Sequence, residues 1–237
     1  MTEGRTTSSK TAIVTGASRG LGLALALALA QRGWRLVIDA RSADELEAAR
    51  AALADAGADV TAVVGDIADS WHRGTLVEAA GERIDLLVNN ASVLGAAPLP
   101  ALADYPIDVL EQVLRINTIA PLALIQLALP RMAAGARIVN IGSDAAVEAY
   151  EGWGGYGASK AALEQLTAVL GAERPDLRVY AVDPGDMNTR MNQDAHPGED
   201  ISDLPPPQES VPGLLVLVEG DVPSGRQRAS ELGAARA

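Results

Sequence analysis

Thr15-Gly16-Ala17-Ser18-Arg19-Gly20-Leu21-Gly22 is the stretch of sequence that decides the fold. It follows one apolar run and opens another, Leu21 to Ala30, which is typical of a buried helix. Its glycines permit a tight turn and let the backbone approach a pyrophosphate, while a helix N-terminus supplies free N–H groups and roughly half a positive charge. Between a strand and a helix, such a turn predicts a dinucleotide-binding loop. A plain strand-to-helix connection is the alternative.

Outward from this turn, apolar runs alternate with Ala- and Leu-rich stretches. Ala43 to Ala56 and Tyr156 to Gly171 are long enough to be crossover helices. Continuous apolar runs are typical of strands that are buried on both faces of a parallel sheet. The pattern predicts an α/β fold, a single Rossmann-type doubly wound parallel sheet with helices on both faces and ligands at the carboxyl ends of the strands. We expect about seven strands, at residues 11–15, 35–39, 59–64, 86–89, 136–141, 178–182 and 214–218.

The chain length predicts one domain. Two full domains would not fit comfortably in 237 residues, so we expect a single dinucleotide-binding domain over residues 1–237. We expect residues 1–9 and 226–237 to be flexible ends. Residues 192–210 are rich in Pro, Asp and Glu, and we expect a loop or lid there.

The composition excludes several classes of function. A net charge of −12 argues against nucleic-acid binding, which needs a basic stripe. The absence of cysteine excludes disulfides and thiolate zinc sites. The N-terminus lacks an apolar signal core, and the apolar run at residues 21–30 is too short to span a bilayer, so we expect a cytoplasmic protein with no membrane partner. His72 and His196 are isolated; we expect both to face solvent and assign no metal.

The end of the second predicted strand bears on which dinucleotide binds. NAD sites usually place a carboxylate there for the ribose diol, whereas NADP sites place an arginine for the 2′-phosphate. Both types occur here, as Asp39 and Arg41. Arg19, in the glycine turn, could converge with Arg41 on one phosphate. We therefore expect NADP(H) as the cofactor. NAD(H) is the alternative: Asp39 supports it, and Arg41 could be a solvated loop charge that binds no phosphate.

The candidate acid-base residues lie in the segment Tyr156-Gly157-Ala158-Ser159-Lys160. Its spacing puts Tyr156 and Lys160 on one face of a helix, one turn apart. A phenol with a pKa near ~10 is a poor acid-base group at neutral pH, and an adjacent ammonium stabilises its phenolate. Tyr156 could then give a proton to a carbonyl oxygen while a nicotinamide delivers hydride. Ser143, at the end of a predicted strand, could hold the same oxygen. Taken alone, the Tyr-Lys spacing often arises by chance.

Together these motifs resemble the short-chain dehydrogenase/reductase family, in the family's order, from about Lys10 to Gly225. Residues 15–22 resemble its cofactor turn, Asn89-Asn90-Ala91-Ser92 the motif beside the ribose, and residues 184–189 the segment that packs on the nicotinamide. The resemblance implies a set of cofactor contacts: Gly16, Ser18, Arg19, Gly20, Leu21, Gly22, Arg41, Asp66 (at the adenine), Ile67, Asn90, Ala91, Tyr156, Lys160, Pro184, Gly185 and Thr189.

The resemblance also implies a catalytic set of Asn117, Ser143, Tyr156 and Lys160. In that set Lys160 would bond the nicotinamide ribose and lower the pKa of Tyr156. Asn117 would hold a water that passes protons to Lys160, and Ser143 would orient the substrate oxygen. The alternatives are a helix-kink residue for Asn117, a strand-end cap for Ser143 and a surface charge for Lys160.

The sequence departs from the family pattern in places. Ser92 replaces the usual glycine, and Asp144 and Asp186 add carboxylates near the active site. Residues 144–155 should line the substrate pocket, where Glu148, Tyr150 and Trp153 are the most informative side chains; packing at a dimer edge is the alternative for them.

The sequence as a whole predicts an NADP(H)-dependent oxidoreductase acting on a small-molecule carbonyl or alcohol. The family resemblance implies a homo-dimer or homo-tetramer, formed through the helices around Asn117 and Tyr156. Two alternatives remain: an NAD-dependent alcohol dehydrogenase of the same family, and a non-catalytic member that senses NADP(H) or scaffolds a partner.

Overall fold

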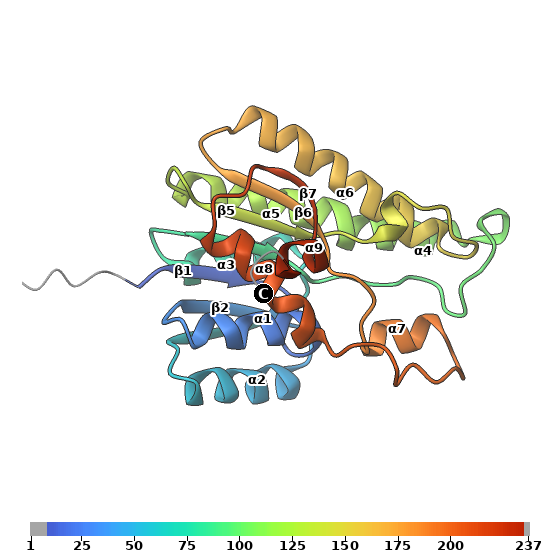
Figure 1. Cartoon of the computed structure of the whole chain (residues 1–237), viewed down its shortest axis with the longest axis horizontal. Helices are drawn as coiled ribbons and strands as arrows, with labels where there is room; N and C mark the ends of the chain where they lie inside the picture. The colour runs from blue at the N-terminus through green and yellow to red at the C-terminus, as the bar shows by residue number, and fades with distance from the viewer. Residues whose placement is uncertain (1–8, 235–237) are drawn as a thin grey trace, which may run out of the picture.

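A single parallel sheet organises the computed structural model, which describes residues 9–234 (Figure 1). Seven strands of the described chain follow the order β3-β2-β1-β4-β5-β6-β7. The order reverses beside β1, where β1 pairs with both β2 and β4, and this is where a doubly wound sheet binds its ligand. The predicted fold class is therefore confirmed. The strands are β1 Thr11–Val14, β2 Arg35–Ala40, β3 Val60–Val64, β4 Leu86–Asn89, β5 Arg137–Ile141, β6 Arg178–Asp183 and β7 Gly225–Arg228.

Helices cover both faces of the sheet, because successive residues of a buried strand point to opposite sides. Val14 of β1 belongs to a core shared with α1, α2 and α8, whereas its neighbour Ile13 belongs to a second core shared with α3 and α5. Figure 1 shows α1 and α2 on one side of the sheet and α5 and α6 on the other. The helices are α1 Gly20–Ala30, α2 Ala43–Asp55, α3 Ser70–Ala80, α4 Ile107–Leu114, α5 Ala120–Ala128, α6 Gly154–Glu173, α7 Arg190–Ala195, α8 Val211–Glu219 and α9 Ala229–Ala234.

The prediction of a strand at residues 214–218 is wrong. These residues lie in α8, which has a proline in its first turn and buries Leu214, Leu217 and Val218 completely. An apolar run that is buried nearly all round has the same pattern in a helix as in a central strand. The seventh strand is instead the polar β7, which sequence patterning overlooks because its sequence is Gly-Arg-Gln-Arg.

The expectation of a flexible end from residue 226 is also wrong for residues 226–234, which belong to β7 and α9. Residues 1–8 and 235–237, the rest of the two expected flexible ends, lie outside the described residues. The expected loop or lid at residues 192–210 is partly helical. It begins within α7, whose first turn is capped by the Thr189 hydroxyl accepting from the Asn192 N–H at 3.3 Å, and it ends in a short 3₁₀ turn, Pro207–Ser210.

One helical stretch of the described chain, Ile107–Arg131, is long and apolar enough to cross a membrane by length and composition. Half of its most apolar window is buried inside the fold. Core helices of soluble proteins pass the same test, so this stretch is weak evidence for a membrane span.

Candidate active site

A cavity of about 1800 Å³ lies at the carboxyl ends of the strands. It is larger than the ~300–1,000 Å³ of a typical small-ligand pocket, so it has room for a dinucleotide and a substrate together. All the cofactor residues expected from the sequence line this cavity except Gly22. Gly22 instead packs under the turn, where an added Cβ would lie 2.6 Å from the Gly16 carbonyl oxygen.

The glycine turn leaves the start of α1 open to the cavity. Gly16 and Gly20 both have positive φ, +65° and +57°, which only glycine adopts without strain. An added Cβ at Gly20 would meet nothing closer than a Thr189 methyl at 3.9 Å. The N-cap residue Arg19 provides no side-chain cap, and the first turn contains no acidic residue. Free N–H groups and open space at a helix N-terminus fit the pyrophosphate of a dinucleotide.

Asp39 borders the cavity, but its carboxylate is already engaged by other residues of the protein. Its side chain is 2% exposed, and both carboxylate oxygens are engaged. Oδ1 accepts the Gly16 N–H at 2.7 Å, and Oδ2 lies 3.0 Å from His72 Nε2. The expectation that His72 faces solvent is therefore wrong, because this histidine is 3% exposed and holds Asp39 under the glycine turn. His196 is half-buried rather than exposed, with Nδ1 3.0 Å from the Asn192 carbonyl oxygen.

Two arginines lie at the nucleotide end of the cavity. Arg41 is exposed beyond β2 and forms no ion pair with any described residue, whereas Arg19 pairs with Glu45 of α2 at 2.8 Å. Both line the cavity, and their contact with a 2′-phosphate stays a prediction. The Asn90 amide donates to the carbonyl oxygens of Thr15 and Gly16, at 2.9 and 3.1 Å, and so braces the glycine turn.

Tyr156 and Lys160 lie on one face of α6 at the cavity wall. Tyr156 is 8% exposed and Lys160 is 2% exposed, with the Lys160 Nζ 5.5 Å from the centre of the Tyr156 ring. Lys160 Nζ donates to the Ile141 carbonyl oxygen at 2.8 Å, and burial lowers the pKa of its ammonium to about 8. Burial raises the pKa of Tyr156 well above its ordinary value, while the hydroxyls of Ser92 and Ser143 oppose that rise. Lys160 is therefore not a surface charge.

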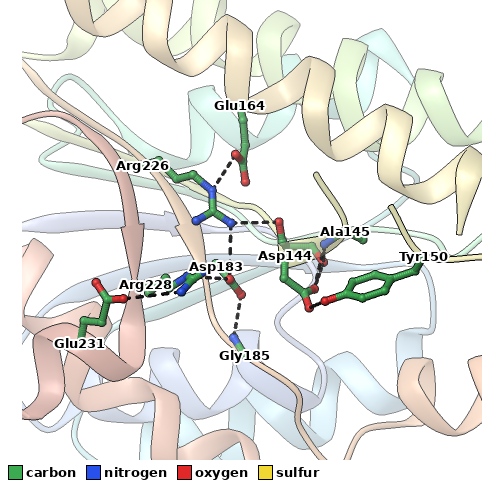
Figure 2. Close-up of polar contacts among 10 residues, drawn as sticks. Asp144, Ala145, Tyr150, Glu164, Asp183, Gly185, Arg226, Arg228 and Glu231 are labelled. Carbon is green, nitrogen blue, oxygen red and sulfur yellow. Dashed lines mark hydrogen bonds and ion pairs between the residues drawn. The ribbon is translucent and has the colours of Figure 1, made fainter. Parts of the chain in front are cut away.

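Ser143 and Asp144 follow the end of β5 and face the same cavity. The Ser143 hydroxyl donates to Asp144 Oδ1 at 3.0 Å and accepts the Ala145 N–H at 3.1 Å. Asp144 Oδ2 in turn accepts from the Tyr150 hydroxyl at 2.9 Å (Figure 2). Ser143 thus caps a turn and also lies beside Tyr156, so the capping and orienting interpretations are compatible.

The substrate end of the cavity is aromatic and acidic. Trp153 contacts Tyr156 edge-to-face, with ring centres 5.7 Å apart. Asp186 also lines the cavity, and its pKa is raised by burial and by the nearby Asp144 and Asp183. Tyr150 and Trp153 line the cavity as expected, whereas Glu148 does not. In the described part of the chain, no group of three or more His, Cys, Asp or Glu could hold a metal ion.

Asn117 lies in a π-helical turn, Arg115–Ile119, between α4 and α5. It is buried and does not line the cavity. Its side-chain oxygen accepts from the Val93 N–H at 2.9 Å, and its amide nitrogen donates to Val93 O at 2.9 Å and to Ser159 Oγ at 3.0 Å. These bonds tie the turn to α6 beside Lys160, an arrangement that fits the helix-kink interpretation; a water-holding role stays a prediction.

Comparison with known proteins identifies the family. The chain matches the family model described as short chain dehydrogenase over residues 10–200. The chain belongs to the short-chain dehydrogenase family. As a member of that family, it is an oxidoreductase.

Relatives of this short-chain dehydrogenase include biosynthetic enzymes. The rhamnolipids biosynthesis 3-oxoacyl-(acyl-carrier-protein) reductase of Pseudomonas aeruginosa is 36% identical over 213 residues, covering 85% of this chain and 81% of that protein. The 1-deoxy-11-beta-hydroxypentalenate dehydrogenase of Streptomyces avermitilis is 36% identical, covering 77% of this chain and 70% of that protein. A short chain dehydrogenase of Escherichia coli solved with NADPH has a TM-score of 0.86 at 26% identity, covering 93% of this chain and 96% of that chain.

Sequence reasoning gave no structural role to three residues at this site: His72, Glu164 and Arg226. Glu164 was detectable, since it follows Lys160 by one helical turn and so shares its face of α6. The partners His72–Asp39 and Arg226–Glu164 are 33 and 62 residues apart. No local pattern in the sequence connects residues so far apart.

The buried Lys160 should make stability depend on pH. An unfolded lysine keeps its proton up to about pH 10.5, whereas the folded one releases it near pH 8, so stability rises with pH between these values. Lys160→Met removes the buried charge. We expect the free energy of unfolding of the wild type, relative to Lys160→Met, to improve by about 2 kcal/mol from about pH 7 to about pH 9.5. Denaturant titrations of both proteins across this range measure the difference.

The matched control is Lys10→Met, because Lys10 is the other lysine of the chain and is exposed. The difference between wild type and this control should stay constant with pH. A constant difference for Lys160→Met as well would show that Lys160 keeps an ordinary pKa, contrary to its burial.

Proposed function

We propose that this protein is an NADP(H)-dependent oxidoreductase that interconverts a small-molecule carbonyl compound and the corresponding alcohol. The observation that carries the proposal is the placement of Ser143, Tyr156 and Lys160 in the same cavity as the open N-terminus of α1. One end of that cavity suits a dinucleotide, and the other end holds a proton donor.

The protein's own groups divide the work. The glycine turn and the α1 N-terminus would hold the pyrophosphate. Residues 184–189 would hold the nicotinamide, and Lys160 would bond the nicotinamide ribose. When bound, the nicotinamide supplies or accepts the hydride. The Ser143 hydroxyl orients the substrate oxygen, and Tyr156 gives that oxygen its proton in reduction. A raised pKa keeps the Tyr156 hydroxyl protonated at neutral pH, which suits proton donation.

The Lys160 ammonium stabilises the phenolate that Tyr156 becomes. Its pKa of about 8 leaves it largely charged at neutral pH. Alcohol oxidation needs the phenolate at the start, so oxidation should accelerate as the pH rises. Asn117 fixes the π-helical turn beside α6, and we propose that it supports a proton path from Lys160 to solvent.

The cofactor proposal rests on charge. The Asp39 carboxylate bonds to Gly16 and lies within hydrogen-bond distance of His72, so it is not available to the ribose diol that would favour NAD. Arg41 and Arg19 remain at that end of the cavity, and guanidinium groups suit a 2′-phosphate. Short chain dehydrogenases of Escherichia coli and Shigella flexneri with the same fold were solved with NADPH and NADP. NAD(H) is the alternative cofactor.

The substrate is a small molecule that enters beside Tyr150 and Trp153. The similarity to a 3-oxoacyl-(acyl-carrier-protein) reductase and to a hydroxypentalenate dehydrogenase supports a carbonyl compound or an alcohol as the substrate. We further propose a cytoplasmic homo-dimer or homo-tetramer. The competing function, a non-catalytic NADP(H) sensor, is disfavoured because Tyr156 and Lys160 are both present and face the cavity.

Replacement of Tyr156 by Phe tests the enzymatic function. A panel of ketones, 3-oxoacyl thioesters, quinones and sugars is first screened with NADPH. On the best substrate, we expect Tyr156→Phe to lose about a thousandfold or more in turnover, because general acid catalysis is removed, while NADPH binding persists. Tyr180→Phe is the control, since Tyr180 lies in β6 outside the cavity and its hydroxyl bonds Val222 O. Equal turnover in Tyr156→Phe and wild type would refute the assigned role.

Replacement of Arg41 by Ala tests the cofactor. We expect the wild type to bind NADPH at least about tenfold more tightly than NADH, a difference of about 1.4 kcal/mol. Arg41→Ala should lose most of that preference by weakening NADPH binding, with NADH binding unchanged. Fluorescence titration measures both. Arg50→Ala, which removes an arginine of α2 that pairs with Glu47 outside the cavity, should leave both affinities unaltered. Tighter binding of NADH by the wild type would instead establish the NAD alternative.

A further inference from the structure

The last strand of the sheet brings an arginine pair to the active site. Arg226 and Arg228 are two residues apart in β7, so their side chains project to the same face. β7 pairs in parallel with β6, and its register sets Arg228 opposite Asp183 at the carboxyl end of β6. Figure 2 shows both guanidinium groups directed toward Asp183, with Glu164 above Arg226 and Asp144 to the right.

Arg226 joins three segments of the active site. Its Nε donates to Glu164 Oε2 at 2.9 Å, which ties it to α6 one turn beyond Lys160. Its Nη2 donates to the Ser143 carbonyl oxygen at 3.4 Å and to Asp183 Oδ2 at 3.4 Å. Asp183 Oδ1 in turn accepts the Gly185 N–H at 3.0 Å, at the expected nicotinamide segment. A single guanidinium thus contacts the helix and strand ends that carry the proposed catalytic and cofactor residues.

The two carboxylates that Arg226 contacts are buried. The side chains of Glu164 and Asp183 are 10% and 9% exposed. An added Cβ at Gly142, next to Ser143, would lie 2.5 Å from Glu164 Oε1, so Glu164 packs directly against the end of β5. Burial raises the pKa of Glu164, and the Arg226 charge opposes that rise. Two buried carboxylates without a cation would be unfavourable, and Arg226 supplies that cation.

We propose that Arg226 is a positioning residue of the active site, which balances the charges of Glu164 and Asp183 and holds α6 and Ser143 in place for the Tyr156–Lys160 pair. This role rests on the proposed function. It is separate from the proposed catalytic residues, because Arg226 does not line the main cavity and acts only through Glu164, Asp183 and the Ser143 carbonyl.

The charges around Tyr156 and Lys160 determine how the loss of Arg226 would affect their pKa values. Glu164 raises the pKa of Lys160, while Asp144 and Asp183 raise that of Tyr156. Asp186 follows β6, and Arg228 pairs with Asp183 at 3.8 Å and with Glu231 of α9 at 3.7 Å. Arg226 therefore contacts both Glu164 and Asp183, whereas Arg228 contacts only Asp183 of the two and at a longer distance. Its removal should disfavour the Tyr156 phenolate, because uncompensated negative charge remains beside it.

The test is the pH dependence of kcat/KM for oxidation of the best alcohol with NADP⁺. Oxidation needs the phenolate, so its rate rises along a limb set by the apparent pKa of the Tyr156–Lys160 pair. In Arg226→Met this limb should move to higher pH by about one unit. In Glu164→Gln it should move to lower pH, since a negative charge is removed. The double variant should return toward the wild type, and Arg226→Lys should stay close to it.

Arg178→Met is the matched control, because Arg178 forms an exposed ion pair of 2.8 Å with Asp221 at the other end of β6. The rising limb of the kcat/KM pH profile of Arg178→Met should coincide with that of the wild type. Glu164→Gln keeps the shape of the side chain and tests the proposal even if Arg226→Met does not fold.

Unmoved limbs in Arg226→Met and Glu164→Gln would overturn the proposal, as would a loss of stability with a uniform fall in rate and no shift. An inactive wild type across the whole panel would instead contradict the proposed function, and this inference with it.

Discussion

The hydrogen bond from Lys160 Nζ to the Ile141 carbonyl oxygen, 2.8 Å long, fixes α6 against the end of β5. The rest of the site depends on it. Tyr156 lies one turn before Lys160 on the same helix face, and Ser143 lies two residues beyond Ile141, so one contact sets the distance between the two hydroxyl-bearing residues. Burial of the ammonium is unfavourable, as its lowered pKa indicates. Such a cost at a cavity wall is typical of functional groups rather than of structural ones.

Charged side chains line both ends of the cavity around this contact. The nucleotide end combines the open N-terminus of α1 with Arg19 and Arg41, although the chain as a whole carries a net charge of −12. The substrate end carries Asp144 and Asp186. The placement of individual charges therefore matters more for anion binding than the net charge of the chain. Asp39, the carboxylate nearest the glycine turn, is directed inward to Gly16 and His72. Glu45 at the same end pairs with Arg19, whereas Arg41 forms no ion pair with a described residue and stays available to an anion.

Much of this was predictable from sequence, and the failures have one physical cause. The glycine turn, the Tyr156–Lys160 spacing and the first six strands follow from patterns confined to a few adjacent residues. The run at residues 214–218 was misassigned because complete burial removes the periodicity that distinguishes a helix from a strand. His72 and Arg226 were missed because their roles arise from partners that only the folded chain brings near. Tertiary pairing of charged groups leaves little trace in local sequence.

The most direct test of the account uses NADPH in which both hydrogens at C4 of the nicotinamide are replaced by deuterium. After reduction of the best carbonyl substrate from the panel, mass spectrometry of the alcohol locates the label. The account predicts deuterium on the carbinol carbon, because the hydride comes from the cofactor. The alcohol oxygen takes its proton from Tyr156, which exchanges with water, so the oxygen carries no label. An alcohol without deuterium, formed while NADPH is consumed, would contradict hydride transfer at this site.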